Sequence, residues 1–252
     1  MRGIARVSDD FRPVVVVPTY DNPMTVRAVI ERIREHHPDV LVIDDGSGPD
    51  GRAACEGIAQ DGLAHVHHRV ANGGKGAAVL TGFEVAQALG FTHAFQIDAD
   101  GQHDITRIPV FLETGRAQPK ALLLGAPIYD DSAPKNRQIA RRITNFWVNL
   151  EAGRGRITDA MVGFRVYPLA RALAANVKGR RMDFDVEIAV QMARDGGPVV
   201  NLPVAVRYPS KAEGAVSHFR PFGDNLRLAW LHCRMCTRGA TSWCLRKLRL
   251  RR

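Results

Sequence analysis

The sequence is poor in cysteine and lacks both a leader pattern and a long apolar run. Only four of its 252 residues are cysteines, too few and too unevenly spaced for a disulfide framework. No N-terminal stretch resembles a signal peptide, and no apolar run approaches the roughly 18 to 20 residues that span a bilayer. We therefore expect a reduced, cytoplasmic protein. Cys233 and Cys236 form a CxxC pair near His232 and Cys244, but without a second spaced pair a zinc site is disfavoured.

The net charge of the chain is +9, and no acidic residue follows Asp224, so the positive charge is concentrated in the C-terminal segment. Apolar residues recur at helical spacing from Leu226 onward, and tryptophans and leucines then alternate with arginines up to the C-terminus. An amphipathic basic segment of this kind fits the headgroup region of an anionic bilayer. The alternative is a helix packed on the core followed by a disordered basic tail. We expect no nucleic-acid partner, because no recognition module is visible.

Short β-branched runs alternate with helical patterns in the first half of the chain, which predicts βαβ units and an α/β fold. We expect a Rossmann-like, mainly parallel sheet flanked by helices. The predicted strands include residues 14–17, 40–43 and 94–97, and the predicted helices include residues 23–36 and 76–89. We assign residues 1–215 to one catalytic domain and residues 216–252 to a flexible segment followed by the basic amphipathic tail at the membrane surface.

Carboxylates follow two of these strands, at the sheet edge where open α/β sheets bind ligands. Residues 98–103 read Asp-Ala-Asp-Gly-Gln-His, so that Asp98, Asp100 and Gln102 alternate along the chain. Oxygen ligands suit Mg²⁺ or Mn²⁺, which binds one or two carboxylates together with substrate phosphates. The pattern indicates a metal-diphosphate site, and the alternative is an Asp-rich turn with solvated carboxylates.

Other segments of the first half suit a nucleotide. Tyr20 follows Pro18 at a strand end and offers an aromatic face, and Asp45 offers hydrogen-bond acceptors to a base or ribose. The glycine-rich residues 72–76 open a helix, where backbone N–H groups and Lys75 suit a phosphate. Each segment alone is equally consistent with a strand end or a turn.

Together these segments resemble the family 2 glycosyltransferases, most closely the dolichyl- and polyprenyl-phosphate sugar synthases. The resemblance rests on the order and spacing of residues 17–20, 44–47, 72–76, 98–103, 163–165 and 184–187, together with Asp159, and covers roughly residues 13–210. It implies a GT-A fold, a UDP- or GDP-hexose donor, Mg²⁺ or Mn²⁺, and inversion at the anomeric carbon.

The resemblance also implies roles for individual residues. Pro18, Tyr20, Asp45 and Lys75 would contact the donor. Asp98 would lie on the nucleotide-sugar side, with Asp100 as the main metal ligand and Gln102 as a further ligand. Ser217 lies in a segment that resembles the one that closes over bound substrates in this family.

The acceptor is the open question, because residues 125–127 read Gly-Ala-Pro where the resembling enzymes typically show Gly-Ser-Arg. Arg137, Arg141 and Arg142 lie downstream and could bind an anionic acceptor or form a solvated helix face. If the acceptor is a hydroxyl, Asp159 is our candidate base. If it is a phosphate, Arg165 is the candidate phosphate contact.

We therefore predict a metal-dependent, inverting hexosyltransferase that acts on a lipid acceptor, most favourably a polyprenyl phosphate, at the cytoplasmic face of a membrane. Transfer to the hydroxyl of a lipid or secondary metabolite is the alternative within the class. A nucleotidyltransferase is a further alternative, although its glycine-rich signature is missing after the first strand. The last alternative is a non-catalytic protein that binds a nucleotide sugar.

Overall fold

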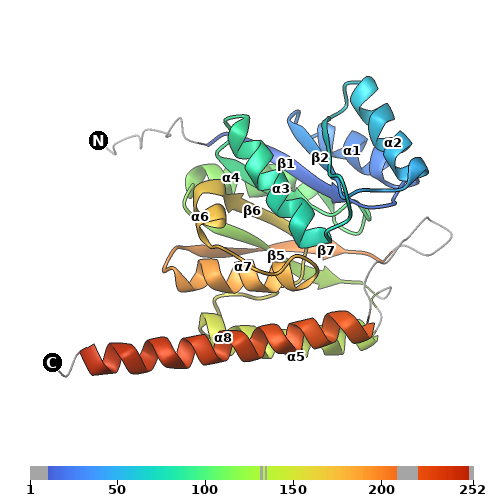
Figure 1. Cartoon of the computed structure of the whole chain (residues 1–252). Helices are drawn as coiled ribbons and strands as arrows, with labels where there is room; N and C mark the ends of the chain where they lie inside the picture. Colours follow the sequence, from blue (N-terminus) through green and yellow to red (C-terminus); the bar gives the residue numbers. More distant parts are fainter. Residues whose placement is uncertain (1–10, 131–132, 134, 209–220, 250–252) are drawn as a thin grey trace, which may run out of the picture.

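The computed structural model describes residues 11–130, 133, 135–208 and 221–249, without the side chains of 135–137, 221–222 and 238–249 (Figure 1). Within these residues, the strands are β1 Pro13–Thr19, β2 Val40–Asp44, β3 His65–His68, β4 His93–Ile97, β5 Leu122–Tyr129, β6 Phe164–Pro168 and β7 Val199–Val206. They form one sheet in the order β3-β2-β1-β4-β6-β5-β7. Only β6 runs antiparallel to its neighbours among these strands. The predicted α/β fold with a mainly parallel sheet is confirmed.

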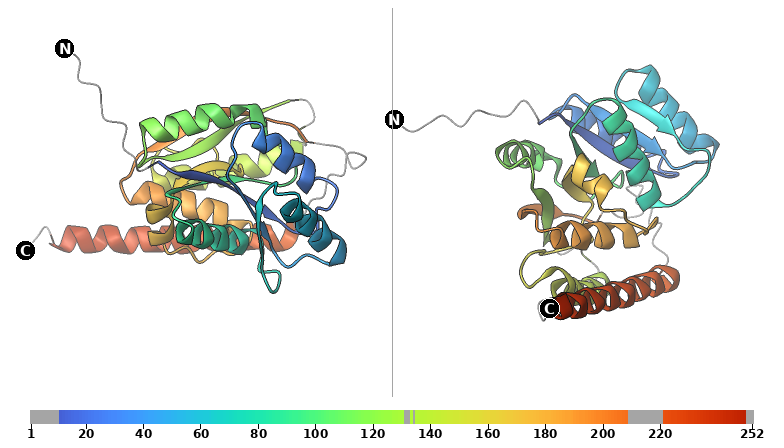
Figure 2. Two further views of the ribbon diagram at one scale, coloured as in Figure 1. Left: turned by 90° about the horizontal axis from the view of Figure 1, so that it is seen from above. Right: turned by 60° about the vertical axis from the view of Figure 1, so that its left-hand side comes forward.

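Helices cover both faces of this sheet (Figures 1 and 2). Val15 and Val17 of β1 face one hydrophobic core, and Val14 and Val16 face the other, because successive side chains of a strand point to opposite faces. The first core is closed by α1 Val26–Arg34, α2 Pro49–Gln60, the 3₁₀ turn η1 Ile105–Arg107 and α4 Ile108–Ala117. The second is closed by α3 Lys75–Ala88, α6 Leu169–Ala174 and α7 Asp183–Arg194.

Two predicted element ends differ from the structure. Strand β1 continues through Pro18 to Thr19. Strand β4 pairs with β1 only from Pro13 to Val16, so the missing N–H of Pro18 removes no donor from that ladder. Helix α1 begins at Val26 rather than at residue 23. Met24, which falls within the predicted helix, lies in the preceding turn and is exposed.

The two remaining helices, α5 Lys135–Ala152 and α8 Pro221–Arg249, form a further layer beyond α7 (Figures 1 and 2). Leu228, Leu231 and Met235 of α8 are buried in the second core. The first part of the predicted tail is therefore a helix packed on the domain. The domain boundary predicted at residue 215 lies outside the described residues, as does Ser217. No described helix is both long and apolar enough to cross a bilayer.

Candidate active site

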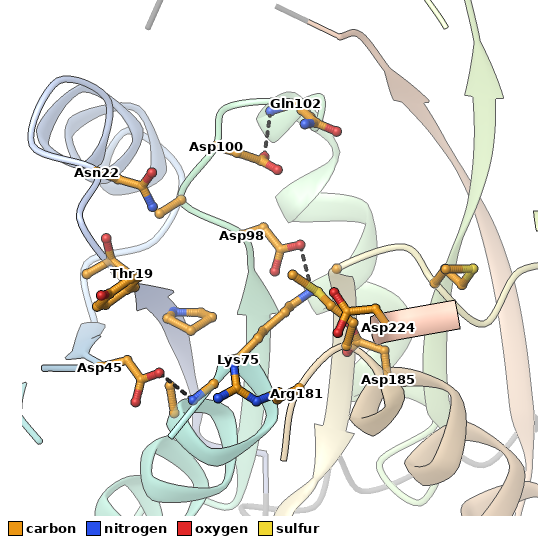
Figure 3. A pocket seen from close by; sticks show the side chains of 18 of the residues that line it. Thr19, Asn22, Asp45, Lys75, Asp98, Asp100, Gln102, Arg181, Asp185 and Asp224 are labelled. Carbon is orange, nitrogen blue, oxygen red and sulfur yellow. Dashed lines mark hydrogen bonds and ion pairs between the residues drawn. The ribbon is translucent and has the colours of Figure 1, made fainter. Parts of the chain in front are cut away.

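A cavity of about 580 Å³ opens at the carboxyl ends of β1, β2 and β4. Seven of the predicted site residues line it, and ten of the side chains around it are labelled in Figure 3. The seven are Pro18, Tyr20, Asp45, Lys75, Asp98, Asp100 and Gln102. Asp159 and Arg165 do not line the cavity. The sequence therefore located most of one wall, while Arg181, Met182, Tyr208 and Asp224 line the cavity from segments that carried no motif.

Asp45 directly follows β2 and fixes the glycine-rich loop. Its carboxylate accepts hydrogen bonds from the N–H groups of Gly73 at 3.0 Å and Gly74 at 2.7 Å, and it pairs with Arg69. Gly74 has a φ of +93°, a conformation that glycine adopts at little cost. The two N–H groups that we expected at a phosphate are thus engaged by a carboxylate, which shapes the loop before any donor arrives.

The neighbouring Asp44 fixes the turn after β2. It accepts from the N–H of Ser47 at 2.9 Å and lies 2.8 Å from Nδ1 of His68. Burial acts to raise the pKa of Asp44, but the hydrogen bonds from Ser47 and His68 outweigh it, and the pKa lies below its ordinary value. This carboxylate therefore stays ionised and holds the segment that carries Asp45.

Lys75, at the start of α3, lies between two carboxylates. Its Nζ is 2.7 Å from Asp98 and 2.7 Å from Asp185 (Figure 3). Burial alone would lower the pKa of Lys75, but Asp185 and Asp98 raise it above its ordinary value. In the sequence, Asp185 stands out only as a member of the resembling residues 184–187. The structure brings it from the first turn of α7 into the cavity, where Gln96 also donates to it at 3.2 Å.

The remaining residues of the predicted metal site suit a divalent cation whose shell a diphosphate completes. Asp100 lines the cavity and accepts from the N–H of Gln102 at 3.1 Å. Burial and the negative charge of Asp98 raise its pKa above the ordinary value, so excess negative charge collects where a cation would relieve it. No three His, Cys, Asp or Glu side chains converge as a ready-made cage in the described part of the chain. A site that shares its cation with substrate phosphates needs only one or two carboxylates.

The cysteines of α8 also fail to form a metal centre within the described residues. Cys233 is exposed, and Cys236 is half-buried, with its Sγ 3.7 Å from Glu151. The side chain of Cys244 lies outside the description.

Asp159 does not occupy the position that we expected of a base. Both of its oxygens accept from Nη1 of Arg141, at 2.9 and 3.0 Å, and one also accepts from the N–H groups of Met161 and Val162. The carboxylate is buried, whereas Arg141 lines the cavity. Asp159 is thus placed to orient Arg141, whose guanidinium also lies 5.7 Å from the ring centre of Tyr129.

Arg165 is likewise placed behind the cavity rather than in it. Its side chain is fully buried in β6 and donates to the backbone carbonyls of Val162 and Asp185. A direct phosphate contact therefore does not agree with its position. The structure instead makes Arg165 a brace between β6 and the helix that carries Asp185.

Arg181, Met182, Tyr208 and Asp224 complete the cavity, and our sequence analysis assigned none of them to it. Arg181 lies against Gly74, the residue before Lys75, in a loop with no periodic pattern. Asp224 was noted only as the last acidic residue. No motif would have indicated either residue.

Comparison with known proteins agrees with this geometry. The sequence model described as "Glycosyl transferase family 2" matches residues 14–170. The undecaprenyl-phosphate mannosyltransferase of Micrococcus luteus is 28% identical over 204 residues, which cover 77% of this chain and 82% of that protein. The polyprenol monophosphomannose synthase of Mycolicibacterium smegmatis is 28% identical over 237 residues, or 89% of this chain and 86% of that protein.

A solved structure shares the fold. Glucosyl-3-phosphoglycerate synthase of Mycobacterium tuberculosis, in complex with Mn²⁺ and uridine-diphosphate-glucose, superposes with a TM-score of 0.60 and 14% sequence identity. The superposition covers 86% of this chain and 75% of that one.

Proposed function

We propose that this chain, which belongs to glycosyl transferase family 2, transfers a hexose from a nucleoside-diphosphate sugar to a polyprenyl phosphate, with inversion at the anomeric carbon. The observation that carries the proposal is the cavity itself, which strand-end carboxylates and the guanidinium of Arg141 line together at the carboxyl edge of the sheet. The two mannosyltransferase relatives support a lipid phosphate as acceptor and mannose as the sugar to test first.

The donor would occupy the wall built by β1, β2 and α3. Tyr20 and Asp45 flank the space for a base and ribose, and Arg181 is the additional cation against Gly74. The glycine-rich loop is already shaped by Asp45, so donor binding orders little further backbone, which lowers its entropic cost. UDP- and GDP-sugars are both to be tested as donors.

A divalent cation, Mg²⁺ or Mn²⁺, would be held by Asp100 with Asp98 and Gln102, where it would act as a Lewis acid for the departing diphosphate. Lys75 holds Asp98 at its Nζ, so it orients this carboxylate and offsets part of its charge. Preorganised charges of this kind stabilise a transition state without reorganising during the reaction.

The position of Asp159 favours a phosphate acceptor over a hydroxyl. A phosphate is already largely ionised near neutral pH and needs no strong base, whereas a hydroxyl must lose its proton. The carboxylate that we expected to take that proton is buried and bound to Arg141. Arg141 lines the same cavity and offers a positive charge to an anionic acceptor, which would compensate for the arginine missing at residues 125–127.

The test is metal-dependent release of nucleoside diphosphate from UDP- and GDP-hexoses with a purified polyprenyl phosphate as acceptor. The Asp100→Asn variant is expected to lose release, and Asp50→Asn, which changes an exposed aspartate at the start of α2, is expected to retain it. Release that requires a free lipid hydroxyl instead of the phosphate would overturn the acceptor assignment. No release from any donor by the folded protein would overturn the proposed activity.

A further inference from the structure

Helix α5 exposes an apolar stripe on the side away from the core. Ile139 is 59% exposed, Ile143 58%, Phe146 65% and Leu150 65%. These positions follow helical spacing and form one face. Val148 and Ala152 of the same helix are buried in the core. The helix is therefore apolar on both sides, and burial in the core accounts for only one of them.

Helix α8 carries a second stripe of the same kind. Leu226 is 63% exposed and Trp230 67% exposed, and Cys233, one turn further on, is also exposed. The core residues of α8 lie at other positions around the helix. The two helices lie side by side (Figure 2), and Trp147 of α5 stacks on His232 of α8 with ring centres 6.2 Å apart. We call the exposed stripes, Ile139, Ile143, Phe146 and Leu150 of α5 with Leu226 and Trp230 of α8, the α5–α8 face.

The exposed charges that these two helices contribute have one sign among the side chains that the structure describes. The acidic residues in the sequences of the two helices are Glu151 and Asp224, and both are buried. Glu151 is engaged by His232, and Asp224 by Arg227. Arginines remain outside, with Arg142 exposed and the side chain of Arg227 46% exposed. Apolar side chains bordered by positive charge match an anionic lipid surface, where both terms favour binding.

The same layer also borders the cavity. Ala140 and Arg141 of α5 and Asp224 of α8 line it, and Ala140 directly follows the first residue of the apolar stripe. A surface that contacts the α5–α8 face would therefore adjoin the wall of the cavity that carries Arg141.

We propose that the α5–α8 face docks the protein on an anionic lipid bilayer, with Phe146 and Trp230 inserted among the headgroups. This inference rests on the proposed function only where it has the acceptor enter from that bilayer; the docking itself follows from the exposed side chains and their charge. A second copy of the chain fits the face less well, because two such faces would bring like charges together.

The first test is flotation of the full-length chain with phosphatidylcholine vesicles that contain or lack phosphatidylglycerol. We expect binding to the anionic vesicles that weakens as salt rises. The double variant Phe146→Glu/Trp230→Glu should bind at least about tenfold more weakly, roughly 1.4 kcal/mol. Leu89→Glu, which changes an exposed leucine at the end of α3, should bind like the wild type. Equal binding by the double variant and the wild type would overturn the proposal, as would a dimer that only the double variant loses.

A second readout leaves the apolar residues unchanged. A polarity-sensitive fluorophore on Cys233, in a chain with Cys236→Ser and Cys244→Ser, should shift to the blue with anionic vesicles only. Burial raises the pKa of Cys55 to about 12, so this remaining thiol does not compete for the label. If the emission wavelength of the label does not change when anionic vesicles are added, docking is contradicted, even if the double variant fails to fold.

Comparing acceptors separates the two proposals. The double variant should retain transfer to a detergent-dispersed polyprenyl phosphate and lose it when the same lipid is presented in vesicles. If the wild type docks but transfers no sugar in either format, the proposed function fails and the docking face stands. If transfer from vesicles proceeds equally in both proteins, the docking face is wrong and the proposed function stands.

Discussion

Both carboxylate oxygens of Asp159 accept from Nη1 of Arg141, at 2.9 and 3.0 Å, so the buried carboxylate and the cavity-lining guanidinium form one unit. The pair joins the loop before β6 to α5. Through it, a residue that does not reach the cavity controls the direction of one that does.

Replacement of Asp159 by Asn should therefore weaken acceptor binding rather than abolish chemistry. The amide keeps an oxygen for the N–H groups of Met161 and Val162 but loses the charge that orients Arg141. We expect the KM for a polyprenyl phosphate to rise about tenfold, or ~1.4 kcal/mol, with the KM for the donor unchanged. Steady-state kinetics with each substrate varied in turn measure both.

A double-mutant cycle distinguishes this role from that of a base. If Asp159 acts through Arg141, then Asp159→Asn should add little in an Arg141→Ala background. A full loss of turnover when Asp159→Asn is added to that background would restore the base assignment. Asp195→Asn removes an ion pair with Arg171 on the surface and serves as the matched control.

Loss of the ammonium between Asp98 and Asp185 should be costly to stability. Lys75→Met leaves two largely buried carboxylates without their shared partner, and breaking a buried pair of this kind costs about 3–5 kcal/mol. Mn²⁺ should raise the melting temperature of this variant more than that of the wild type, because a cation can replace the lost charge at Asp98. Thermal unfolding with and without MnCl₂ gives the answer, with the exposed Lys120→Met as control. An identical Mn²⁺ shift in all three proteins would show that Asp98 does not contribute to the metal site.

Gly163 should tolerate no side chain. A Cβ atom there would overlap the carboxylate of Asp98, whereas one at Gly57 of α2 would meet only the end of Arg27, 3.8 Å away. Gly163→Ala should displace Asp98, and misplacement by about 1 Å can cost on the order of 100-fold in rate. We expect turnover to fall by that order while Gly57→Ala remains active. Nearly normal turnover in Gly163→Ala would mean that the position of Asp98 does not limit the reaction.

Asp44 should make the protein sensitive to acid. Its folded-state pKa is depressed, so its contribution to stability is fully present above its unfolded value of about 3.9 and is lost as pH falls through the lower folded value. The wild type should lose melting temperature below about pH 4, whereas Asp44→Asn should be less stable at pH 7 and show a flatter acid profile. Unfolding scans from neutral to acidic pH measure both slopes. Parallel profiles for the two proteins would contradict the assignment.

Sequence reasoning reached the elements whose signal is local. The valine run of β1 and the Asp-x-Asp after β4 placed Asp98 and Asp100 at the sheet edge because parallel strands end together there. It failed where a side chain's direction depends on distant pairing. Arg165 lies opposite Gln96 in the antiparallel ladder between β4 and β6, and the direction in which it points follows from that register.

The same limit explains the other misplaced residues. Whether Asp159 meets substrate or Arg141 depends on how α5 lies against the loop before β6, which no spacing in the sequence encodes. Asp185 belongs to the resembling residues 184–187, but nothing in that motif points to Lys75, which is far away in the chain. An apolar stripe at helical spacing is the usual sign of a core-facing side, and only the packed structure shows that Ile139, Ile143 and Phe146 of α5 lie outside.

The cavity is built from two separate stretches of chain. Its lining residues lie either between Pro18 and His103 or between Ala140 and Asp224, and the intervening segment contributes none of those described. The two stretches meet where Lys75 pairs with both Asp98 and Asp185 and where Gly163 lies against Asp98, so neither wall can change at those positions without disturbing the other. Libraries confined to Ala140 and Arg141 would explore new acceptors while these shared contacts stay unchanged.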